Sequence, residues 1–340
     1  MKVIVTGGTG YIGSHTIVDL IQHGFEVICL DNLSRSNLYA LEGIEKITGI
    51  KPIFYQVDLC DKKATFEIIA QHKEAVGIIH FAALKSVPES VEQPLLYYNN
   101  NIDSLLTVLA AIQAFNIPNQ VFSSSCSVYG NAEELPVTEN TPLQTAESPY
   151  AHTKQIGEDI IANFSKADAS QHILLRYFNP VGAHPSALIG EIPIDKPNNL
   201  VPYITQTAIG KLSQMTVFGD DYDTRDGSCI RDYIHVCDIA HAHTLALQYL
   251  LKNKKITPVE VFNLGTGNGV SVLEIIHAFE KVSHQKLNYK IGAKRPGDVV
   301  AVYADNSKAT AQLGWECQYS LEDAMLSAWN WELKMKELKL

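Results

Sequence analysis

"KVIVTGGTGYIGS", residues 2–14, joins a short apolar run to a glycine-rich turn and then to a segment with helical spacing. The apolar run predicts a buried strand, and the stretch that continues to His23 predicts a helix. Gly7, Gly10 and Gly13 occupy the turn between them. Glycines at this spacing permit a tight turn, let the backbone approach a pyrophosphate and let the helix pack on the strand. Because a helix N-terminus offers free N–H groups to phosphates, the stretch predicts a dinucleotide-binding βαβ unit.

An acidic residue ends the next predicted strand, "FEVICLD" at residues 25–31. Asp31 can accept hydrogen bonds from both hydroxyls of a ribose, and its charge disfavours a 2′-phosphate. We therefore expect NAD rather than NADP as the cofactor. Arg35 lies close by in the sequence and is the one feature that favours a phosphate.

The same alternation of apolar runs and helical stretches continues along the chain. The helical stretches include 94–115, and the runs are continuous rather than alternating, which is typical of strands covered on both faces. We predict an α/β fold with a Rossmann-type, doubly wound parallel sheet. The runs that we assign to it are 2–7, 25–31, 76–83, 120–125, 173–179 and 261–267.

Proline and glycine become denser after about Pro180, which indicates a second, smaller mixed α/β domain. We expect residues 1–179 to form the NAD-binding domain and residues 180–340 to form the substrate domain. A segment near 236–266 should return to the first domain. Within the later part, "SVLE" at 271–274 has the spacing of a capping box and predicts a helix start.

The composition is that of an ordinary globular protein, with 46% hydrophobic and 19% charged residues. The net charge of −10 argues against nucleic acid or an anionic membrane as the main partner. The six cysteines show no Cys-x-x-Cys pair, which is typical of reduced thiols in a cytosolic protein. We find no signal peptide and no membrane span, and we expect a cytoplasmic protein.

Tyr150 and Lys154 lie four residues apart in "ESPYAHTK", so they share one face of a predicted helix. Ser148 and Pro149 fit a cap and a first-turn proline, which would place Tyr150 near the positive end of that helix. The lysine charge and the helix dipole should then lower the pKa of Tyr150. The spacing alone occurs by chance, but here it follows a dinucleotide loop and a serine-rich strand end. The pair therefore predicts a tyrosine that exchanges a proton with a substrate hydroxyl.

Three consecutive serines precede a cysteine in "SSSCSVYG", residues 123–130, and raise the possibility of a nucleophile. No histidine pattern marks Cys126 or a serine as activated, so we interpret Cys126 as a packing residue. His241 and His243 could suggest a metal, but the sequence shows no third ligand near them. We expect them on a solvated helix face and predict no metal site.

Taken together, the motifs resemble those of the UDP-glucose 4-epimerase family, in the extended branch of the short-chain dehydrogenase superfamily. The matching motifs run from residue 1 to beyond residue 320: "GGTGYIG", "DNLS", "HFAALKSV", "FSSSCSVYG", "SPYAHTK", "RYFNPVGAHPS", "PNNL", "RDYIHV" and "RPGD". The resemblance implies that bound NAD takes a hydride from C4 of a UDP-sugar and returns it to the opposite face of a 4-keto sugar. Tyr150 would take the hydroxyl proton, Ser125 would hydrogen-bond the reacting oxygen, and Lys154 would bind the nicotinamide ribose.

The resemblance also implies two sets of binding residues. The cofactor set comprises Gly7, Gly10, Tyr11, Ile12, Gly13, Asp31, Asn32, Leu33, Ser34, Arg35, Ser36, Asp58, Leu59, Phe81, Ala82, Ala83, Leu84, Lys85, Asn100, Ser125, Tyr150, Lys154 and Phe178. The substrate set comprises Lys85, Ser125, Tyr150, Tyr177, Asn179, Asn199, Leu200, Val217, Phe218, Arg231, Arg295, Asp298 and Val302. The two arginines of the second set would face the phosphates. A purely structural role stays open for Phe178, Leu200 and Phe218 in the core, and for Arg231 in an ion pair with Asp232.

Val302 differs from what many members of the resembled family have. A large aromatic residue at this position closes the sugar pocket to N-acetyl groups, and a small residue admits them. The resemblance therefore implies that UDP-GlcNAc and UDP-GalNAc are also substrates.

Three other enzyme classes and one kind of non-catalytic protein share parts of this sequence pattern. A nucleotide-sugar 4,6-dehydratase needs an Asp-Glu pair after the hydroxyl residue, where this chain has Cys126 and Ser127. A UDP-glucuronate 4-epimerase or a decarboxylase fits the sugar-side motifs less well, and a non-catalytic dinucleotide sensor need not keep Tyr150 and Lys154.

The resemblance also implies a homodimer through the helices at 94–115 and 149–164.

Overall fold

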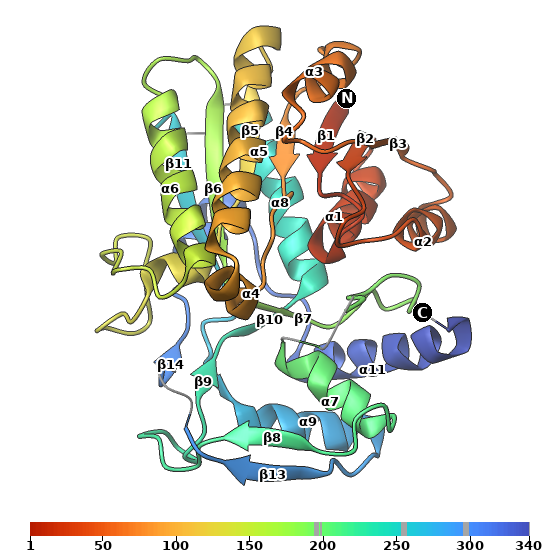
Figure 1. Ribbon diagram of the computed structural model, residues 1–340, viewed down its shortest axis with the longest axis vertical. Helices are drawn as coiled ribbons and strands as arrows, with labels where there is room; N and C mark the ends of the chain where they lie inside the picture. Colours follow the sequence, from red (N-terminus) through yellow and green to blue (C-terminus); the bar gives the residue numbers. More distant parts are fainter. Residues whose placement is uncertain (194–196, 198, 253–256, 295–298, 340) are drawn as a thin grey trace.

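A parallel sheet of seven strands forms the larger body of the molecule in a computed structural model that describes residues 1–193, 197, 199–252, 257–294 and 299–339 (Figure 1). Every neighbouring pair of strands in the sheet runs parallel. In spatial order the strands are β11 (Val259–Leu264), β6 (Gln171–Tyr177), β5 (Asn119–Ser123), β4 (Ile78–His80), β1 (Lys2–Thr6), β2 (Glu26–Asp31) and β3 (Ile53–Gln56).

Helices cover both faces of this sheet. Val3 and Val5 of β1 face one apolar core, and Ile4 between them faces the other, so alternate residues of one strand are buried on opposite sides. This is why the runs read as continuously apolar. The first core is closed by α1 (Tyr11–Gln22), α2 (Tyr39–Thr48) and α8 (Val236–Leu251), and the second by α3 (Lys62–Ala70), α5 (Pro94–Phe115) and α6 (Pro149–Phe164). The predicted doubly wound sheet is confirmed.

The helix starts follow the local sequence signals. Ser148 caps α6 by accepting a hydrogen bond from the Ala151 N–H, and Pro149 is the first helical residue. Ser271 and Glu274 form the expected capping box at the start of α9. Both predicted helix starts are confirmed.

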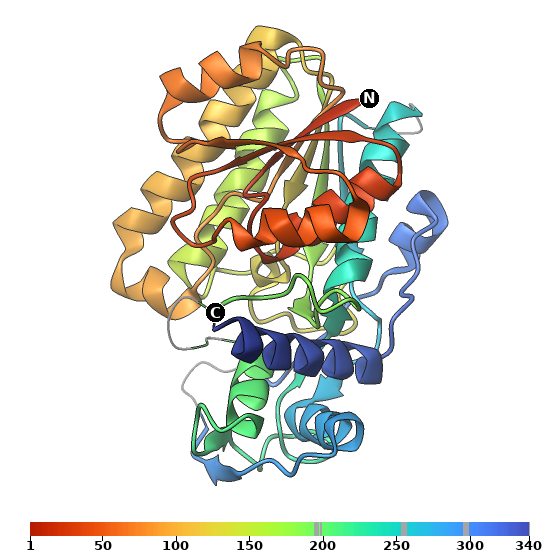
Figure 2. The ribbon, with the colours of Figure 1, turned by 90° about the vertical axis from the view of Figure 1, so that its right-hand side faces the viewer.

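The smaller body lies below the carboxyl ends of the sheet strands and is built from short strands and helices (Figures 1 and 2). Its strands pair as β10 (Tyr233–His235) with β7 (Asn179–Val181), β13 (Tyr289–Gly292) with β8 (Met215–Phe218), and β12 (Val270–Ser271) and β14 (Ala301–Val302) on either side of β9 (Ile230–Arg231). Its helices are α7 (Leu200–Ala208), α9 (Val272–Ser283) and α11 (Leu321–Leu338). Figure 2 shows α11 running across the boundary between the two bodies.

The chain crosses between the two bodies more than once. After the first strands of the smaller body it returns through α8 and β11 to the large sheet, where β11 pairs with β6. Helix α10 (Ser307–Leu313) also packs on the large sheet, because Ala309 and Leu313 belong to the same apolar core as α1 and α8. Two short elements, α4 (Val87–Glu92) and the 3-10 turn η1 (Cys126–Tyr129), lie in the loops after β4 and β5.

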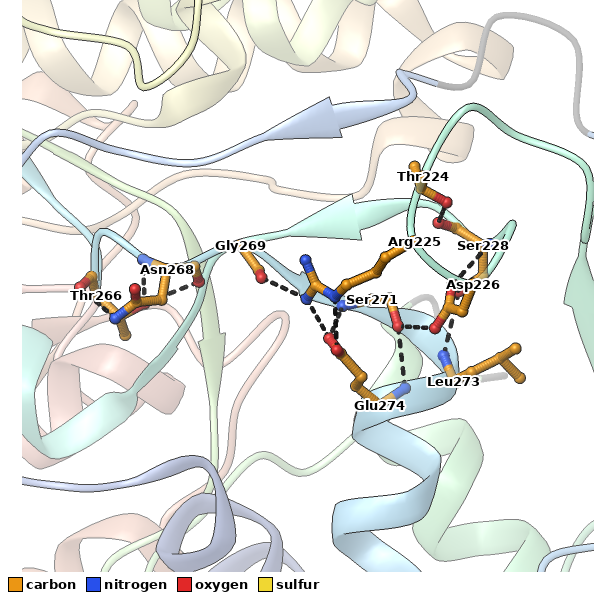
Figure 3. Close-up of polar contacts among 10 residues, drawn as sticks. All are labelled: Thr224, Arg225, Asp226, Ser228, Thr266, Asn268, Gly269, Ser271, Leu273 and Glu274. Carbon is orange, nitrogen blue, oxygen red and sulfur yellow. Dashed lines mark hydrogen bonds and ion pairs between the residues drawn. The ribbon is translucent and has the colours of Figure 1, made fainter.

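A loop of the smaller body is fastened to the start of α9 by side-chain contacts (Figure 3). The Arg225 guanidinium pairs with the Glu274 carboxylate, with a contact of 2.6 Å from Nε to Oε1, and Arg225 also donates to the Gly269 carbonyl. Asp226 accepts a hydrogen bond from the hydroxyl of Ser271. The capping box of α9 therefore also anchors the loop that precedes β9.

Among the described helices, none combines the length and the apolar character that a membrane span requires.

Candidate active site

The glycine turn lies where β1 meets α1, at the point where the strand order reverses between β1 and β4. Gly7 has a φ of +68°, and a Cβ there would lie 2.7 Å from the Ala82 nitrogen. A Cβ on Gly13 would collide with the carbonyl oxygen of Gly7. Gly10 is the N-cap of α1, which has no capping side chain and no acidic residue in its first turn. The positive end of α1 is therefore open to an anion, as a pyrophosphate site requires.

Asp31 holds the same turn together at the end of β2. One carboxylate oxygen accepts from the Thr9 N–H at 3.2 Å, and the other accepts from the Leu33 N–H at 2.9 Å and from the Ser36 hydroxyl at 3.0 Å. Arg35, which favoured a phosphate in the sequence, pairs with Glu89 at 2.5 Å. The arginine charge is thus matched by a carboxylate, which weakens the argument for a 2′-phosphate.

A cavity of about 400 Å³ runs from this turn to the start of α6. Twenty-two of the predicted site residues line it: Gly7, Gly10, Tyr11, Ile12, Gly13, Asp31, Asn32, Ser34, Arg35, Ser36, Asp58, Leu59, Phe81, Ala82, Ala83, Leu84, Lys85, Asn100, Tyr150, Lys154, Tyr177 and Asn199. The structure therefore brings the glycine turn and the Tyr150–Lys154 pair to one cavity.

Lys154 and Tyr150 lie together at the inner end of the cavity. The Lys154 ammonium donates a hydrogen bond of 2.7 Å to the Ser123 carbonyl and lies 6.0 Å from the centre of the Tyr150 ring. The Ser125 side chain lies near the Tyr150 phenol and acts to lower its pKa, and the Ser125 hydroxyl oxygen accepts from the Ser127 N–H at 3.2 Å. Burial lowers the pKa of Lys154 to about 8, and Glu158 partly opposes this effect.

The predicted lowering of the pKa of Tyr150 is wrong for the protein as described. Burial raises the pKa of this phenol above its ordinary value, and the nearby Ser125 side chain opposes the rise only in part. The sequence reveals the favourable lysine and helix dipole, but it does not reveal that the fold partly removes the ring from water.

The three consecutive serines have three different partners. The Ser123 hydroxyl lies 2.6 Å from the Tyr177 hydroxyl, the Ser124 hydroxyl donates to Glu158 at 2.5 Å, and Ser125 contacts Tyr150. Each serine therefore positions a different side chain around the inner end of the cavity.

The comparisons with known proteins agree with this geometry. A family model described as GDP-mannose 4,6 dehydratase matches residues 4–327. UDP-glucose 4-epimerase of Bacillus subtilis (strain 168) is 47% identical over 333 residues, which cover 98% of this chain and 97% of the relative. This chain belongs to the UDP-glucose 4-epimerase family.

Two solved structures of the family are similar over nearly the whole chain. UDP-glucose-4-epimerase from Stenotrophomonas maltophila, with bound NAD and formylated UDP-arabinopyranose, has a TM-score of 0.96 and 44% identity, covering 99% of both chains. UDP-glucose 4-epimerase from Bifidobacterium longum, in complex with NAD+ and UDP, has a TM-score of 0.92 and 44% identity, covering 98% of both chains.

The residues that follow Ser125 separate an epimerase from a dehydratase. Cys126 and Ser127 begin η1, and burial raises the pKa of the Cys126 thiol to about 12. Neither side chain is a carboxylate, so the acid and base of a dehydratase are missing from this position.

Several predicted binding residues of the epimerase family lie outside the cavity lining. Phe178 is buried in a small core that Val302 packs against, and Val217 is buried in the core of the smaller body. Leu200 packs against that second core, and Leu33 donates its N–H to Asp31 from a turn with φ of +60°. The others are Asn179 in β7, Phe218 at the end of β8, Arg231, which is opposite Val302 in the pairing of β9 with β14, and Ser125, which is the N-cap of η1. Arg295 and Asp298 lie outside the described residues.

Sequence reasoning missed the residues that close the cavity from the smaller body. Glu191 accepts hydrogen bonds from Lys85 at 2.8 Å and from Asn199 at 3.0 Å, and its carbonyl accepts from the Trp331 ring N–H at 2.8 Å. The Tyr11 hydroxyl also donates across the boundary, to the Gly182 carbonyl at 2.5 Å. Glu191 and Trp331 are far apart in the sequence and belong to no local motif, so no sequence pattern pointed to them.

The expectation of a solvated helix face at His241 and His243 is wrong for His243. That ring is fully buried and packs against Phe81, with 4.5 Å between ring centroids. His241 is half-buried and lies 3.2 Å from a carboxylate oxygen of Asp19.

Proposed function

We propose that this protein is an NAD-dependent isomerase that interconverts UDP-galactose and UDP-glucose through a transient 4-keto sugar. One observation carries the proposal: Tyr150 and Lys154 line the same cavity as the glycine turn and Asp31. A proton-transfer group and a dinucleotide cradle in one cavity are the parts that this reaction needs. Membership of the family supports the same activity.

The residues at the outer end of the cavity fit a dinucleotide. The uncapped start of α1 suits the pyrophosphate, and a carboxylate at the end of β2 suits ribose hydroxyls. When bound, NAD supplies a reversible acceptor for the hydride of the sugar. The cradle comprises the cofactor residues named above that line the cavity.

Tyr150 is the group proposed to exchange the proton of the sugar 4-hydroxyl. Since burial favours its neutral form, ionisation of Tyr150 requires a positive charge close by. Lys154 supplies such a charge while it stays protonated. Ser125, whose side chain lies near the phenol, can pass the proton between Tyr150 and the substrate oxygen.

The UDP-sugar is proposed to lie against the smaller body. We assign residues 1–179, with the return segment near 236–266, to NAD, and residues 180–340 to the UDP-sugar. Asn199 at the start of α7 and Arg231 of β9 would contact the nucleotide, together with the other substrate residues inferred from the sequence.

N-acetylated substrates are a second part of the proposal, based on Val302. This small side chain sits in β14 opposite Arg231 of β9. We expect turnover of UDP-GalNAc as well as UDP-galactose, and we expect Val302→Tyr to abolish only the former. Equal loss of both activities, or no turnover of UDP-GalNAc by the wild type, would reject this part.

The test of the main proposal is conversion of UDP-galactose by the purified protein without added cofactor. We expect UDP-glucose as the product, turnover reduced by about 10²–10⁴-fold in Tyr150→Phe, and normal turnover by Tyr289→Phe, which alters a tyrosine of β13 outside the cavity. A 6-deoxy-4-keto product would indicate the dehydratase instead, and exclusive turnover of UDP-glucuronate would indicate the UDP-glucuronate 4-epimerase. Binding of NAD with no turnover of any UDP-sugar would indicate a non-catalytic dinucleotide sensor.

The assembly and the location are also proposals. Val91, Leu95 and Leu106 of α4 and α5 are apolar and exposed, Leu95 to 74%. We propose that this face pairs with a second copy to form a homodimer, which light scattering after gel filtration would detect. All six cysteines are free thiols, which supports a cytoplasmic location.

A further inference from the structure

Two helices that pack side by side bring three metal-binding side chains together at one end. Asp19 and His23 lie four residues apart at the end of α1, and His241 lies on α8. One imidazole nitrogen of His241 is 3.2 Å from an Asp19 carboxylate oxygen, and one of His23 is 3.3 Å from the other oxygen. The three ligand atoms all lie within 4.8 Å of one another, and the two rings are 5.3 Å apart.

The chemistry of this group suits a transition metal. Two imidazoles and one carboxylate are a common ligand set for Zn²⁺, which holds such atoms at about 2.1 Å in a tetrahedron. Tetrahedral ligands at that distance are about 3.4 Å apart, close to the two nitrogen–oxygen separations observed here, although His23 Nδ1 also lies 2.8 Å from the Asp19 carbonyl oxygen. The side chains are 18% to 36% exposed, which leaves a position open for a water ligand.

The surroundings also favour a cation. His23 is the C-cap of α1, and the last turn of that helix contains no basic residue. The partial negative charge of the helix end therefore adds to the charge of Asp19.

The group is separate from the candidate active site. None of the three residues lines the cavity, and Asp19 lies nine residues along α1 from the glycine that caps it, about 14 Å at helical rise. An ion here would join α1, which carries the nucleotide turn, to α8, which packs beside it.

We propose that Asp19, His23 and His241 form a binding site for a divalent transition-metal ion such as Zn²⁺, and that the bound ion fastens α1 to α8. The ion has a structural role in this proposal, and it is independent of the sugar chemistry. The alternative is a histidine–carboxylate cluster that binds protons only.

The test is a titration of EDTA-treated, full-length protein with ZnCl₂ at pH 7.5 by calorimetry, repeated with Co²⁺ to read its absorption spectrum. We expect one equivalent to bind, a rise in the thermal midpoint, and the absorption of a four-coordinate Co²⁺ site. His241→Ala should weaken binding at least about tenfold, and His23→Ala should do the same. His277→Ala, which removes an exposed histidine of α9, should bind as the wild type does.

The proposal is overturned if the wild type binds no Zn²⁺ or Co²⁺. It is also overturned if His241→Ala, His23→Ala and His277→Ala all bind as tightly as the wild type, because the ion would then occupy another place. His23→Ala keeps the experiment decisive if His241→Ala does not fold.

Discussion

Glu158 and Arg176 form a buried ion pair one helical turn beyond Lys154 on α6, and neutralising the carboxylate tests its role. Arg176 donates to Glu158 through Nε at 2.9 Å and through Nη2 at 2.6 Å, and the side chains of both residues are 7% exposed. Glu158 also accepts from Ser124. In Glu158→Gln the shape is retained, but the guanidinium is left in the interior without its counter-charge.

We expect Glu158→Gln to lower the free energy of unfolding by a large amount for a single isosteric change. Removing one partner of a buried ion pair costs about 3–5 kcal/mol, and we expect a value near 3 because the glutamine oxygen can still accept a hydrogen bond. Urea unfolding followed by circular dichroism measures the shift of the midpoint. Glu67→Gln, which changes an exposed carboxylate of α3, is the matched control and should leave the midpoint unchanged.

The same substitution should alter the pH dependence of activity. The Glu158 charge raises the pKa of Lys154, while burial lowers it to about 8. Without that charge the lysine loses its proton at a lower pH, so the alkaline fall in activity should begin earlier in Glu158→Gln than in the wild type. If Glu158→Gln unfolds at the wild-type urea concentration and keeps the wild-type pH profile, the ion pair neither stabilises the fold nor tunes Lys154.

Three further substitutions test the site. Tyr150→Phe should reduce turnover by about 10²–10⁴-fold with an unchanged urea midpoint, and turnover within tenfold of wild type would exclude Tyr150 as the proton-transfer group. Lys154→Met should remove a pH-dependent part of the free energy of unfolding. Between about pH 8 and 10.5 the unfolded chain binds a proton that the folded lysine has released, so the stability of the wild type rises with pH. Over this window the free energy of unfolding of the wild type should increase by about 3 kcal/mol relative to the variant. Parallel unfolding curves of the two proteins across that range would contradict it. Gly13→Ala should lower the free energy of unfolding by about 1–3 kcal/mol and weaken NAD binding, because the added Cβ meets the backbone of Gly7 and Gly8. Gly10→Ala should have a smaller effect, because the nearest neighbour of its Cβ is 3.2 Å away. Equal unfolding midpoints of these two variants would show that the close backbone approach at Gly13 does not require glycine.

Much of the fold follows from short-range patterns in the sequence. The continuous apolar run of β1 is buried on both faces, and the serine caps of α6 and α9 lie where their spacing predicted. These features were predictable because capping and burial periodicity depend on residues within about one helical turn or a few strand positions. The glycine turn, Asp31 and the Tyr150–Lys154 spacing belong to the same class.

The sequence by itself therefore determined the Rossmann-type sheet, the glycine turn between its first strand and helix, and the shared helix face of Tyr150 and Lys154. Only the tertiary structure decided how these groups are tuned. It partly buries Tyr150 so that its pKa rises, and it places Glu158 of α6 beside Arg176 of the next element, β6. It also brings His241 from α8 to Asp19 on α1. Burial and charge pairing act through space between elements that are distant in the sequence, so no local pattern encodes them.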